Sequence, residues 1–265
     1  MSSKRRERVT HAILGGAHAQ AWRSLGVWRT GQSDYRTAAQ ALALQLAEQM
    51  SLQAASSLLD VACGYGASLN GWHEMGIRNI TGLEQQTACV QAWQTDRRFQ
   101  CWHNRMQKLN LLSQGQPFEA IIAIDAAYQW DVQLWLQQAH AALCPNGRLG
   151  FHFLLLADDF AQRPLWQKLC TRALLRMVGV KSYLTQSQLQ AALNAHVHQT
   201  WSDVSITDLS DEVLGGLGHY ASRLPTFPLD FDHLTIQLTG HLCRYLHRQK
   251  SVRYVSICLQ KTGPR

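Results

Sequence analysis

The sequence predicts an α/β fold built on a doubly wound parallel sheet, and three observations support this prediction. Strand and helix patterns alternate from about residue 57 to about residue 153. Within this region, the apolar run at residues 120–124 shows no polar alternation, which is typical of a strand buried on both faces. With 265 residues, 46% of them hydrophobic, the chain is long enough to bury such a sheet in one domain.

The elements are assigned in chain order from their hydrophobic periodicity. We expect strands at residues 58–62, 80–84, 99–103, 120–124 and 148–155, and helices at residues 68–75, 87–97 and 134–143. The last of these helices is expected to end before Pro145 and Gly147. In a doubly wound sheet, ligands bind at the carboxyl ends of the strands. The turn after Asp60, the side chain of Glu84 and the segment after Asp125 should therefore meet at one edge.

The segment LLDVACGYG, residues 58–66, leads from an apolar strand through a glycine turn into a helix. A second apolar run ends in Glu84, twenty positions after Gly64. A turn without bulky side chains lets a ligand approach the backbone, and a carboxylate at this distance can accept both hydroxyls of a ribose. We therefore expect a nucleoside cofactor. A dinucleotide is disfavoured, because its fingerprint needs a third glycine at the position of Leu69.

Charge and composition exclude several classes of protein. The net charge of +7 is spread along the chain, apart from a basic start, and no RNA-binding signature is present, so a solvated basic surface is favoured over a nucleic-acid footprint. No apolar run approaches the roughly 18 residues of a membrane span, and the basic start lacks the apolar stretch of a signal peptide. We expect a soluble, unexported protein without stable membrane insertion.

The cysteines and histidines give no sign of a metal site. Seven scattered cysteines without a CxxC pair favour reduced thiols in the cytoplasm over disulfides or zinc. The twelve histidines include no HExxH pattern, and the His196 and His198 pair alone is a weak signal. We therefore expect no metal.

These motifs together resemble those of class I S-adenosylmethionine-dependent methyltransferases. Residues 58–66 resemble the first motif of that family, and residues 82–84 (Gly-Leu-Glu) resemble the second. Residues 118–128 resemble the fourth motif, and residues 143–149 resemble the loop and strand written as leucine, proline, glycine, glycine. Order and spacing agree over residues 57–155. The resemblance implies a Rossmann-like, seven-stranded, mostly parallel sheet with S-adenosyl-L-methionine as cofactor and S-adenosyl-L-homocysteine as product.

The resemblance extends to the flanking segments. Residues 25–28 (Leu-Gly-Val-Trp), Asp34-Tyr35 and a helix at residues 38–50 are similar to the N-terminal helical cap of sterol, tocopherol and phosphoethanolamine methyltransferases. Residues 160–222 are similar to their helical insertion after strand five, which walls the acceptor pocket. One domain, residues 1–265, would then comprise a cap (1–56), a cofactor core (57–155), an insertion with strand six and a long helix (156–250), and a last strand (251–265).

The resemblance also implies roles for individual residues. The implied cofactor-binding residues are Trp28, Tyr35, Asp60, Ala62, Gly64, Gly66, Glu84, Gln85, Arg105, Met106 and Asp125. The acid that usually contacts the adenine is absent at residues 104–106, so only Arg105 or Met106 is expected to flank the ring. Tyr128 and His219 are the candidate catalytic residues, as base or acceptor-orienting groups. Gln129, Trp130, His152 and Tyr220 are expected to line the acceptor pocket.

The implied reaction is an in-line methyl transfer to nitrogen, oxygen or carbon of a small molecule. The methyl group of a sulfonium is already activated, so the protein mainly supplies alignment and excludes water. An acidic acceptor would also need a base, for which His11, His18, His152 and His219 are candidates.

Two alternatives stay open at this point: a methyltransferase acting on RNA or protein, and a cofactor-binding module without catalysis. The basic amphipathic segment at residues 165–178 fits either a membrane surface or, as we favour, a lid over the acceptor pocket. We expect a monomer or homodimer.

Overall fold

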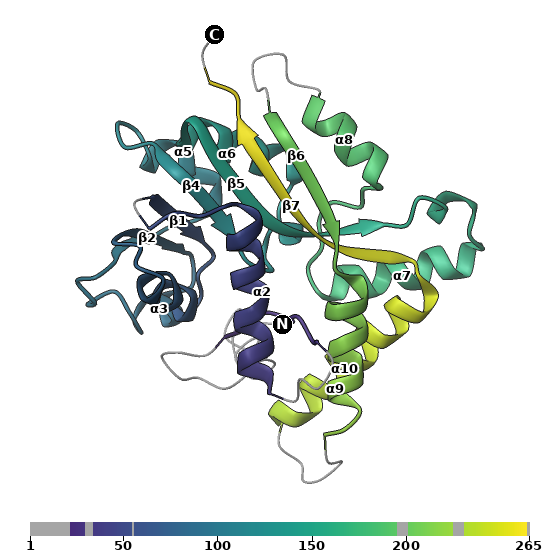
Figure 1. Cartoon of the computed structure of the whole chain (residues 1–265). Helices are drawn as coiled ribbons and strands as arrows, with labels where there is room; N and C mark the ends of the chain where they lie inside the picture. The colour runs from purple at the N-terminus through teal and green to yellow at the C-terminus, as the bar shows by residue number, and fades with distance from the viewer. Residues whose placement is uncertain (1–21, 30–33, 55, 195–200, 225–230, 264–265) are drawn as a thin grey trace.

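The computed structural model of the chain describes residues 22–29, 34–54, 56–194, 201–224 and 231–263. Its centre is a seven-stranded sheet in the order β3-β2-β1-β4-β5-β7-β6, with helices on both faces (Figure 1). Neighbouring strands are parallel except β7, which runs antiparallel to β5 and β6. The predicted Rossmann-like sheet of seven strands is confirmed. The strands are β1 (Ser57–Val61), β2 (Asn79–Glu84), β3 (Gln100–His103), β4 (Phe118–Ala123), β5 (Leu143–Leu156), β6 (Trp201–Asp208) and β7 (Val252–Lys261).

The described helices are distributed as the resemblance implies, with α2 before the sheet and several helices after β5. They are α2 (Tyr35–Gln49), α3 (Ala67–Glu74), α4 (Thr87–Val90), α5 (Leu109–Leu112), α6 (Val132–Ala142), α7 (Leu165–Met177), α8 (Gln186–Asn194), α9 (Gly216–Ala221) and α10 (Phe231–Gln249). Single turns complete them: η1 (Met106–Lys108), η2 (Ala127–Gln129), η3 (Phe160–Gln162) and the π-helical η4 (Asp211–Gly215). None of the helices in these described ranges is long and apolar enough to cross a membrane.

Two elements differ from the sequence prediction. The helix expected at residues 87–97 ends at Val90, and turns follow it. The reason lies in Trp93, whose indole Nε1 donates to the Gly64 carbonyl at 2.9 Å and draws the chain toward the glycine turn. The fifth strand begins at Leu143 instead of residue 148, because Leu143 already pairs with Phe118 before a register shift around Pro145 and Gly147.

The helix α2 covers one face of the sheet. It begins at Asp34, whose side chain accepts the Thr37 N–H at 2.8 Å and so satisfies a backbone donor of the first turn. Its buried residues recur at helical spacing and are mostly small: Ala38, Ala39, Leu42, Ala43, Leu46 and Ala47. The close approach to β5 requires Gly150, because a Cβ there would lie 2.1 Å from the Met50 sulfur. Ala43, Leu46 and Ala47 belong to a core cluster that also contains Ile122, whereas Ala38 and Leu42 belong to the larger cluster that contains Ile121.

A buried carboxylate ties the N-terminal segment to the sheet. Asp125 follows β4, and its Oδ2 accepts the backbone N–H of Leu25 at 2.7 Å. Its Oδ1 accepts the hydroxyl of Tyr254 on β7 at 2.8 Å, and the Tyr128 hydroxyl also donates to this carboxylate. Burial raises the pKa of Asp125 to about 6, and the three donors oppose that rise. One side chain thus joins the cap, the end of β4 and the last strand.

Replacing Gly150 by alanine should destabilise the protein by roughly 1 to 3 kcal/mol, because the new methyl group overlaps the Met50 side chain. Urea unfolding measures this free energy. Gly71→Ala is the matched control: its Cβ would lie 3.8 Å from the nearest atom, and alanine is the better helix former, so stability should hold or rise. Equal effects of the two substitutions would contradict the packing described here.

Asp125→Asn should change the pH dependence of stability. An acid with a raised pKa in the folded chain binds its proton more tightly there, so ionisation opposes folding as pH rises. Asparagine does not ionise. The stability advantage of the wild type over Asp125→Asn should therefore shrink by about 1.4 kcal/mol between about pH 5 and about pH 7.5. Urea unfolding at both pH values measures it. Tyr254→Phe keeps the carboxylate but removes a donor that lowers its pKa, so it should keep a pH dependence of the same sign. An advantage of the wild type over Asp125→Asn that does not vary with pH would contradict this description.

Candidate active site

The turn between β1 and α3 is shaped to admit a ligand. Ala62, Gly64 and Gly66 adopt positive φ angles of 62°, 55° and 79°. A Cβ added to Gly64 would meet no atom within 4 Å, so there is open space above this residue. Gly66 begins α3, where a Cβ would lie 3.0 Å from the Trp93 ring. The predicted strand, glycine turn and helix are therefore present, with room above the backbone of Gly64.

The carboxylate of Glu84 lies beside this turn, as the sequence predicts. Its Oε2 accepts the Gly64 N–H at 3.0 Å, and its Oε1 accepts the N–H groups of Gln85 and Gln86 at 2.8 Å. Burial raises the pKa of the Glu84 carboxyl, whereas these backbone donors and the charge of Arg23 act in the opposite direction. Each carboxylate oxygen has two lone pairs, so Oε2 keeps acceptor capacity for a ligand hydroxyl.

Two strained residues mark the edge at which the site lies. Ala62 and Asp125 are non-glycine residues with positive φ angles of 62° and 52°. Ala62 directly follows β1, and Asp125 lies shortly after the end of β4. These two strands are neighbours in the sheet at the point where the chain order reverses. Crevices at such switch points are the usual ligand sites of open α/β sheets, and backbone strain concentrates at functional sites.

Asp60 lies beneath the turn and faces helix α3. Its Oδ2 accepts the indole N–H of Trp72 at 2.7 Å, and Ser68 also donates to the carboxylate. Burial raises the pKa of Asp60 to about 6. Asp60 therefore holds the first turns of α3 under the glycine turn, consistent with a floor for the ligand.

The segment expected to flank an adenine follows β3. Arg105 is exposed, whereas Met106 is buried in the core cluster that includes Leu83 and Leu109. Asn104 donates its backbone N–H to the Glu84 carbonyl at 3.0 Å, which brings this segment beside the end of β2. Gln85, next to Glu84, has an exposed side chain.

The residues expected to face the methyl group lie in and beside η2, after β4. Tyr128 is buried and its hydroxyl donates to Asp125, and burial raises the pKa of Tyr128 well above its usual value. Gln129 is exposed, and Trp130 packs against Trp135 with ring centroids 5.0 Å apart. Of these three, Tyr128 is thus the one joined to the Asp125 network.

The cap contributes an aromatic cluster that includes Tyr220 from the insertion. Trp28 stacks on Tyr220 with ring centroids 4.3 Å apart, and Tyr35 lies 6.2 Å from Trp28 and 6.5 Å from Tyr220. Tyr35 donates its hydroxyl to the Ser24 carbonyl. Burial raises the pKa of Tyr35, and the negative charge of Asp125 adds to the rise. The structure therefore brings these three predicted residues together, within electrostatic reach of Asp125.

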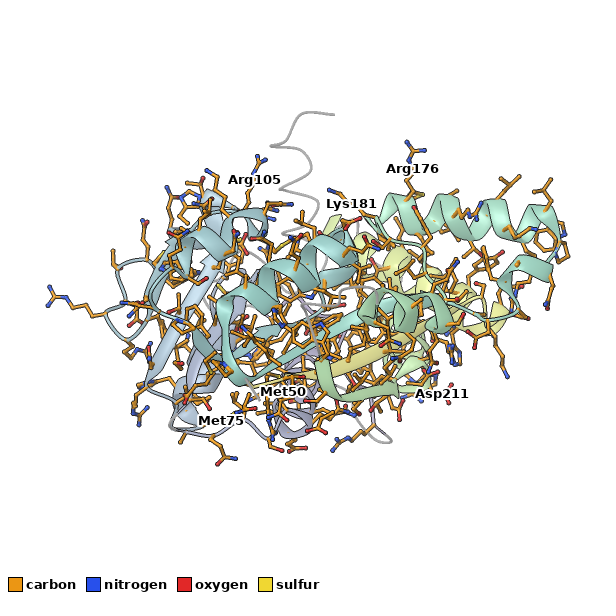
Figure 2. All side chains as sticks on the ribbon, turned by 90° about the horizontal axis from the view of Figure 1, so that it is seen from above. Met50, Met75, Arg105, Arg176, Lys181 and Asp211 are labelled. Carbon is orange, nitrogen blue, oxygen red and sulfur yellow. The ribbon has the colours of Figure 1, made fainter. Side chains whose placement is uncertain are left out.

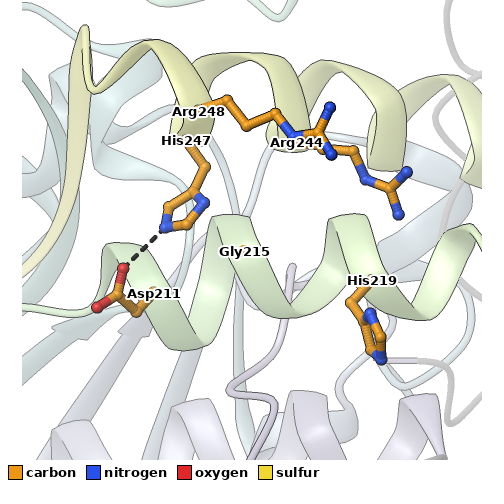
Figure 3. A pocket seen from close by; sticks show the side chains of 6 residues that line it. All are labelled: Asp211, Gly215, His219, Arg244, His247 and Arg248. Carbon is orange, nitrogen blue, oxygen red and sulfur yellow. Dashed lines mark hydrogen bonds and ion pairs between the residues drawn. The ribbon is translucent and has the colours of Figure 1, made fainter.

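Of the candidate histidines, His152 and His219 lie within the described residues, and His152 is the one of the two that contacts Asp125. His219 is exposed on α9 and borders a cavity of about 460 Å³ with Asp211, Gly215, Arg244, His247 and Arg248. In Figure 3 its ring points away from Arg244 and His247. His152 is fully buried in β5, where its Nδ1 accepts the Asp125 backbone N–H at 3.2 Å, and burial lowers its pKa to about 3. His11, His18, His196 and His198 lie outside the described residues.

Two residues at the site were not anticipated from the sequence. The guanidinium of Arg23 lies 3.9 Å from the centre of the Tyr65 ring, and Arg23 and Glu84 interact electrostatically. Trp93 packs against Gly66 and Gly82 and bonds to the Gly64 carbonyl. Neither residue belongs to a recognisable motif. A basic side chain in the cap and a tryptophan shortly after Glu84 were the only available signals.

The site fits the nucleoside sulfonium cofactor that the sequence implies. The open space above Gly64 admits a ligand against the backbone, and the adjacent Glu84 carboxylate matches a ribose. The aromatic cluster and Asp125 lie at the neighbouring strand end, where an electron-rich surface favours a cation. Within the described ranges, no three His, Cys, Asp or Glu side chains are grouped to hold a metal ion.

Comparison with known proteins identifies the core. Residues 59–151 match the family described as a methyltransferase domain. This range runs from β1 into β5 and contains the glycine turn, Glu84 and Asp125. No curated protein sequence matches the chain.

Solved structures share the fold over nearly the whole chain. Geranyl diphosphate C-methyltransferase from Streptomyces coelicolor A3(2), solved with Mg²⁺, geranyl diphosphate and S-adenosyl-L-homocysteine, is 12% identical with a TM-score of 0.68, covering 98% of this chain and 99% of that chain. A mycolic acid cyclopropane synthase, solved with S-adenosyl-L-homocysteine, is 16% identical with a TM-score of 0.73, covering 96% and 94%. The cyclase SpnF is 18% identical with a TM-score of 0.68, covering 97% and 93%.

At these identities the likeness establishes the fold, and the reaction must be argued from the residues of the site. The family match spans the strands that carry the glycine turn and both carboxylates. The core of the chain, residues 59–151, is therefore similar to a methyltransferase domain, and the chain shares its fold with enzymes solved in complex with S-adenosyl-L-homocysteine.

Proposed function

We propose that the protein transfers a methyl group from S-adenosyl-L-methionine to nitrogen, oxygen or carbon of a small-molecule acceptor. The observation that carries the proposal is the Glu84 carboxylate beside the open space over Gly64, at the switch point of the sheet. When bound, the cofactor supplies an activated sulfonium methyl group. Glu84 would hold its ribose, the turn at residues 62–66 would support its amino acid part, and Arg23, which lies over the Tyr65 ring and interacts with Glu84, would meet its carboxylate.

A small acceptor is supported by the way the strand ends are covered. The Asp125 carboxylate holds Leu25 of the cap against the sheet, and the Trp28 backbone N–H donates to the Glu212 carbonyl at 2.9 Å. The cap and insertion are thereby joined above the site, with the aromatic rings of Trp28 and Tyr220 between them. Aromatic side chains that cover the strand ends favour a compact apolar acceptor over a macromolecule. The named acceptors of the two similar enzymes, geranyl diphosphate and mycolic acid, are lipid-like.

The chemistry of the described residues favours catalysis by alignment. The Tyr128 hydroxyl donates to Asp125, and its raised pKa makes it a weak base at neutral pH. The lowered pKa of His152 leaves its ring neutral, and its Nδ1 already accepts a hydrogen bond. We therefore assign Tyr128 an acceptor-orienting role. His219, exposed on α9, would serve only an acceptor that reaches the outer side of that helix.

We further infer that the enzyme works in the reducing cytoplasm as a monomer or homodimer. None of the seven cysteines, all within the described residues, forms a disulfide, and Cys63, Cys89, Cys243 and Cys258 are buried. Burial raises the pKa of Cys63 well above its usual value, so this thiol next to the cofactor turn is protonated and unreactive.

Glu84→Ala should weaken the binding of S-adenosyl-L-homocysteine roughly 10- to 150-fold, the effect of losing charged hydrogen bonds of about 1.5 to 3 kcal/mol. Isothermal titration calorimetry measures this affinity. Because Glu84 also accepts backbone N–H groups, Glu84→Gln serves as a milder variant with an intermediate loss. Glu48→Ala, on the exposed side of α2, is the matched control and should bind normally. Unchanged affinity in folded Glu84→Ala would refute the assignment.

Turnover should be found with small apolar acceptors and should vary little with salt, because the side chains over the strand ends are aromatic and uncharged. Release of S-adenosyl-L-homocysteine across a panel of terpenoid, fatty acyl and phenolic acceptors measures it. Activity on RNA that falls steeply with salt would instead support a nucleic-acid acceptor. Cofactor binding without turnover across small molecules, RNA and protein would support a non-catalytic module.

A further inference from the structure

Helix α7 turns its apolar side chains toward water. Leu165, Trp166, Leu169 and Met177 are 68%, 58%, 57% and 76% exposed, and the side chains buried on this helix are those of Thr171 and Leu175. A surface helix of a globular protein normally shows the opposite arrangement. The expectation that the apolar stripe of α7 covers the acceptor pocket is therefore wrong for Leu169 and Met177.

The exposed side chains form one continuous stripe along the helix. Leu165, Leu169, Ala173 and Met177 follow one another at intervals of four residues, with Trp166 beside them, and all are exposed. We call these five residues the α7 stripe. Over the 13 residues of α7, the stripe is about 20 Å long. Contiguous apolar surface of this kind on a soluble protein marks an interaction site.

The charged side chains carried by α7 itself and by the segment that follows it are all positive. Residues 160–202 contain no Asp or Glu and five basic residues, Arg163, Lys168, Arg172, Arg176 and Lys181. Arg163 pairs with Asp159, whereas Arg172, Arg176 and Lys181 have exposed side chains. In Figure 2, Arg176 and Lys181 project from the same side of the molecule as Arg105. An apolar stripe with a cationic border is complementary to a surface that is apolar inside and anionic outside.

The exposed apolar stripe and its cationic border together favour one binding partner over a second copy of the chain or a nucleic acid. A second copy packed symmetrically on α7 would place the same arginines of two chains against each other, which is repulsive. A nucleic acid would match the charge and leave the apolar stripe in water. Anionic lipid satisfies both features, because acyl chains receive the Leu, Trp and Met side chains while headgroups meet Arg and Lys.

We propose that the α7 stripe docks on the surface of a membrane containing anionic lipid. The helix lies in the plane of the interface without crossing it, with Trp166 at headgroup level. Docking also brings the candidate active site to the membrane. The segment after α7 reaches the turn that carries Tyr128, where the Lys181 N–H donates to the Tyr128 carbonyl at 3.0 Å and Ser182 Oγ donates to the Trp130 carbonyl at 3.3 Å.

Co-sedimentation of the full chain with vesicles tests the proposal without any need for activity. Vesicles of phosphatidylcholine with one third phosphatidylglycerol should bind the protein, and pure phosphatidylcholine should bind it far more weakly. Leu169→Glu should weaken binding roughly tenfold or more, because a charge replaces a leucine that membrane docking would bury among acyl chains. Leu111→Glu on α5 and Leu238→Glu on α10 are matched controls, since both leucines are 59% exposed and lie outside α7, and they should leave binding unchanged.

Two further measurements separate the alternatives. Arg172→Gln with Arg176→Gln should reduce the preference for anionic over neutral vesicles. Brominated acyl chains should quench part of the tryptophan fluorescence, and Trp166→Phe should lose that part. Failure to bind anionic vesicles, equal loss in the Leu111→Glu control, or a dimer that only Leu169→Glu dissociates would overturn the proposal, the last outcome assigning the stripe to a second copy of the chain.

Discussion

The arrangement of the active site depends on the buried carboxylate of Asp125. It accepts hydrogen bonds from the Leu25 backbone, the Tyr254 hydroxyl and the Tyr128 hydroxyl. These donors belong to the N-terminal cap, the last strand and the turn after β4. Removing a carboxylate from water is costly unless hydrogen-bond donors replace its hydration. The need of the Asp125 carboxylate for these donors therefore holds the three segments together. The cap closes over the strand ends because this acceptor must be satisfied there.

The position of the cofactor site follows from the topology of the sheet. β1 and β4 are neighbours although the helices that follow them leave on opposite faces, which opens a crevice at their carboxyl ends. Ala62 and Asp125, both with positive φ, stand at that crevice. Glu84 reaches it from β2 through the backbone N–H of Gly64. The same fold occurs in the cyclase SpnF, so topology selects the location of the site and the side chains around it select the reaction.

The cap, α9 and α7 lie outside the cofactor core and contribute different surfaces. The cap and α9 supply the aromatic rings of Trp28, Tyr35 and Tyr220 over the strand ends. Helix α7 contributes little to the core, since its largest apolar side chains face outward. A helix whose apolar surface is not used for folding is available for association, and the short connection from α7 to Tyr128 links that surface to the site. In the docking that we propose, the surface that meets the membrane is thus connected to the turn that carries Tyr128.

The sequence alone was sufficient for the features that depend on neighbouring residues. The glycine turn, Glu84 and the alternating strands and helices were predicted because they depend on residues close together in the sequence. Hydrophobic periodicity and the preference of glycine for positive φ angles can both be recognised within such short segments. The early end of α4 and the roles of Arg23 and Trp93 were not, because they depend on contacts such as that between Trp93 and Gly64, 29 positions apart. The roles proposed for Tyr128 and His152 likewise required burial and hydrogen bonding, which shift their pKa values, and the role proposed for His219 required its exposure on α9.

Helix α7 shows most clearly the difference between what the sequence determines and what tertiary packing decides. Its sequence determined that residues 165–178 form an amphipathic helix with a basic side. Which side faces the protein was decided only by tertiary packing, where Thr171 and Leu175 are buried and the α7 stripe is not. A periodic pattern specifies that a helix has two faces, whereas the free energy of burying either face depends on what the rest of the chain places against it.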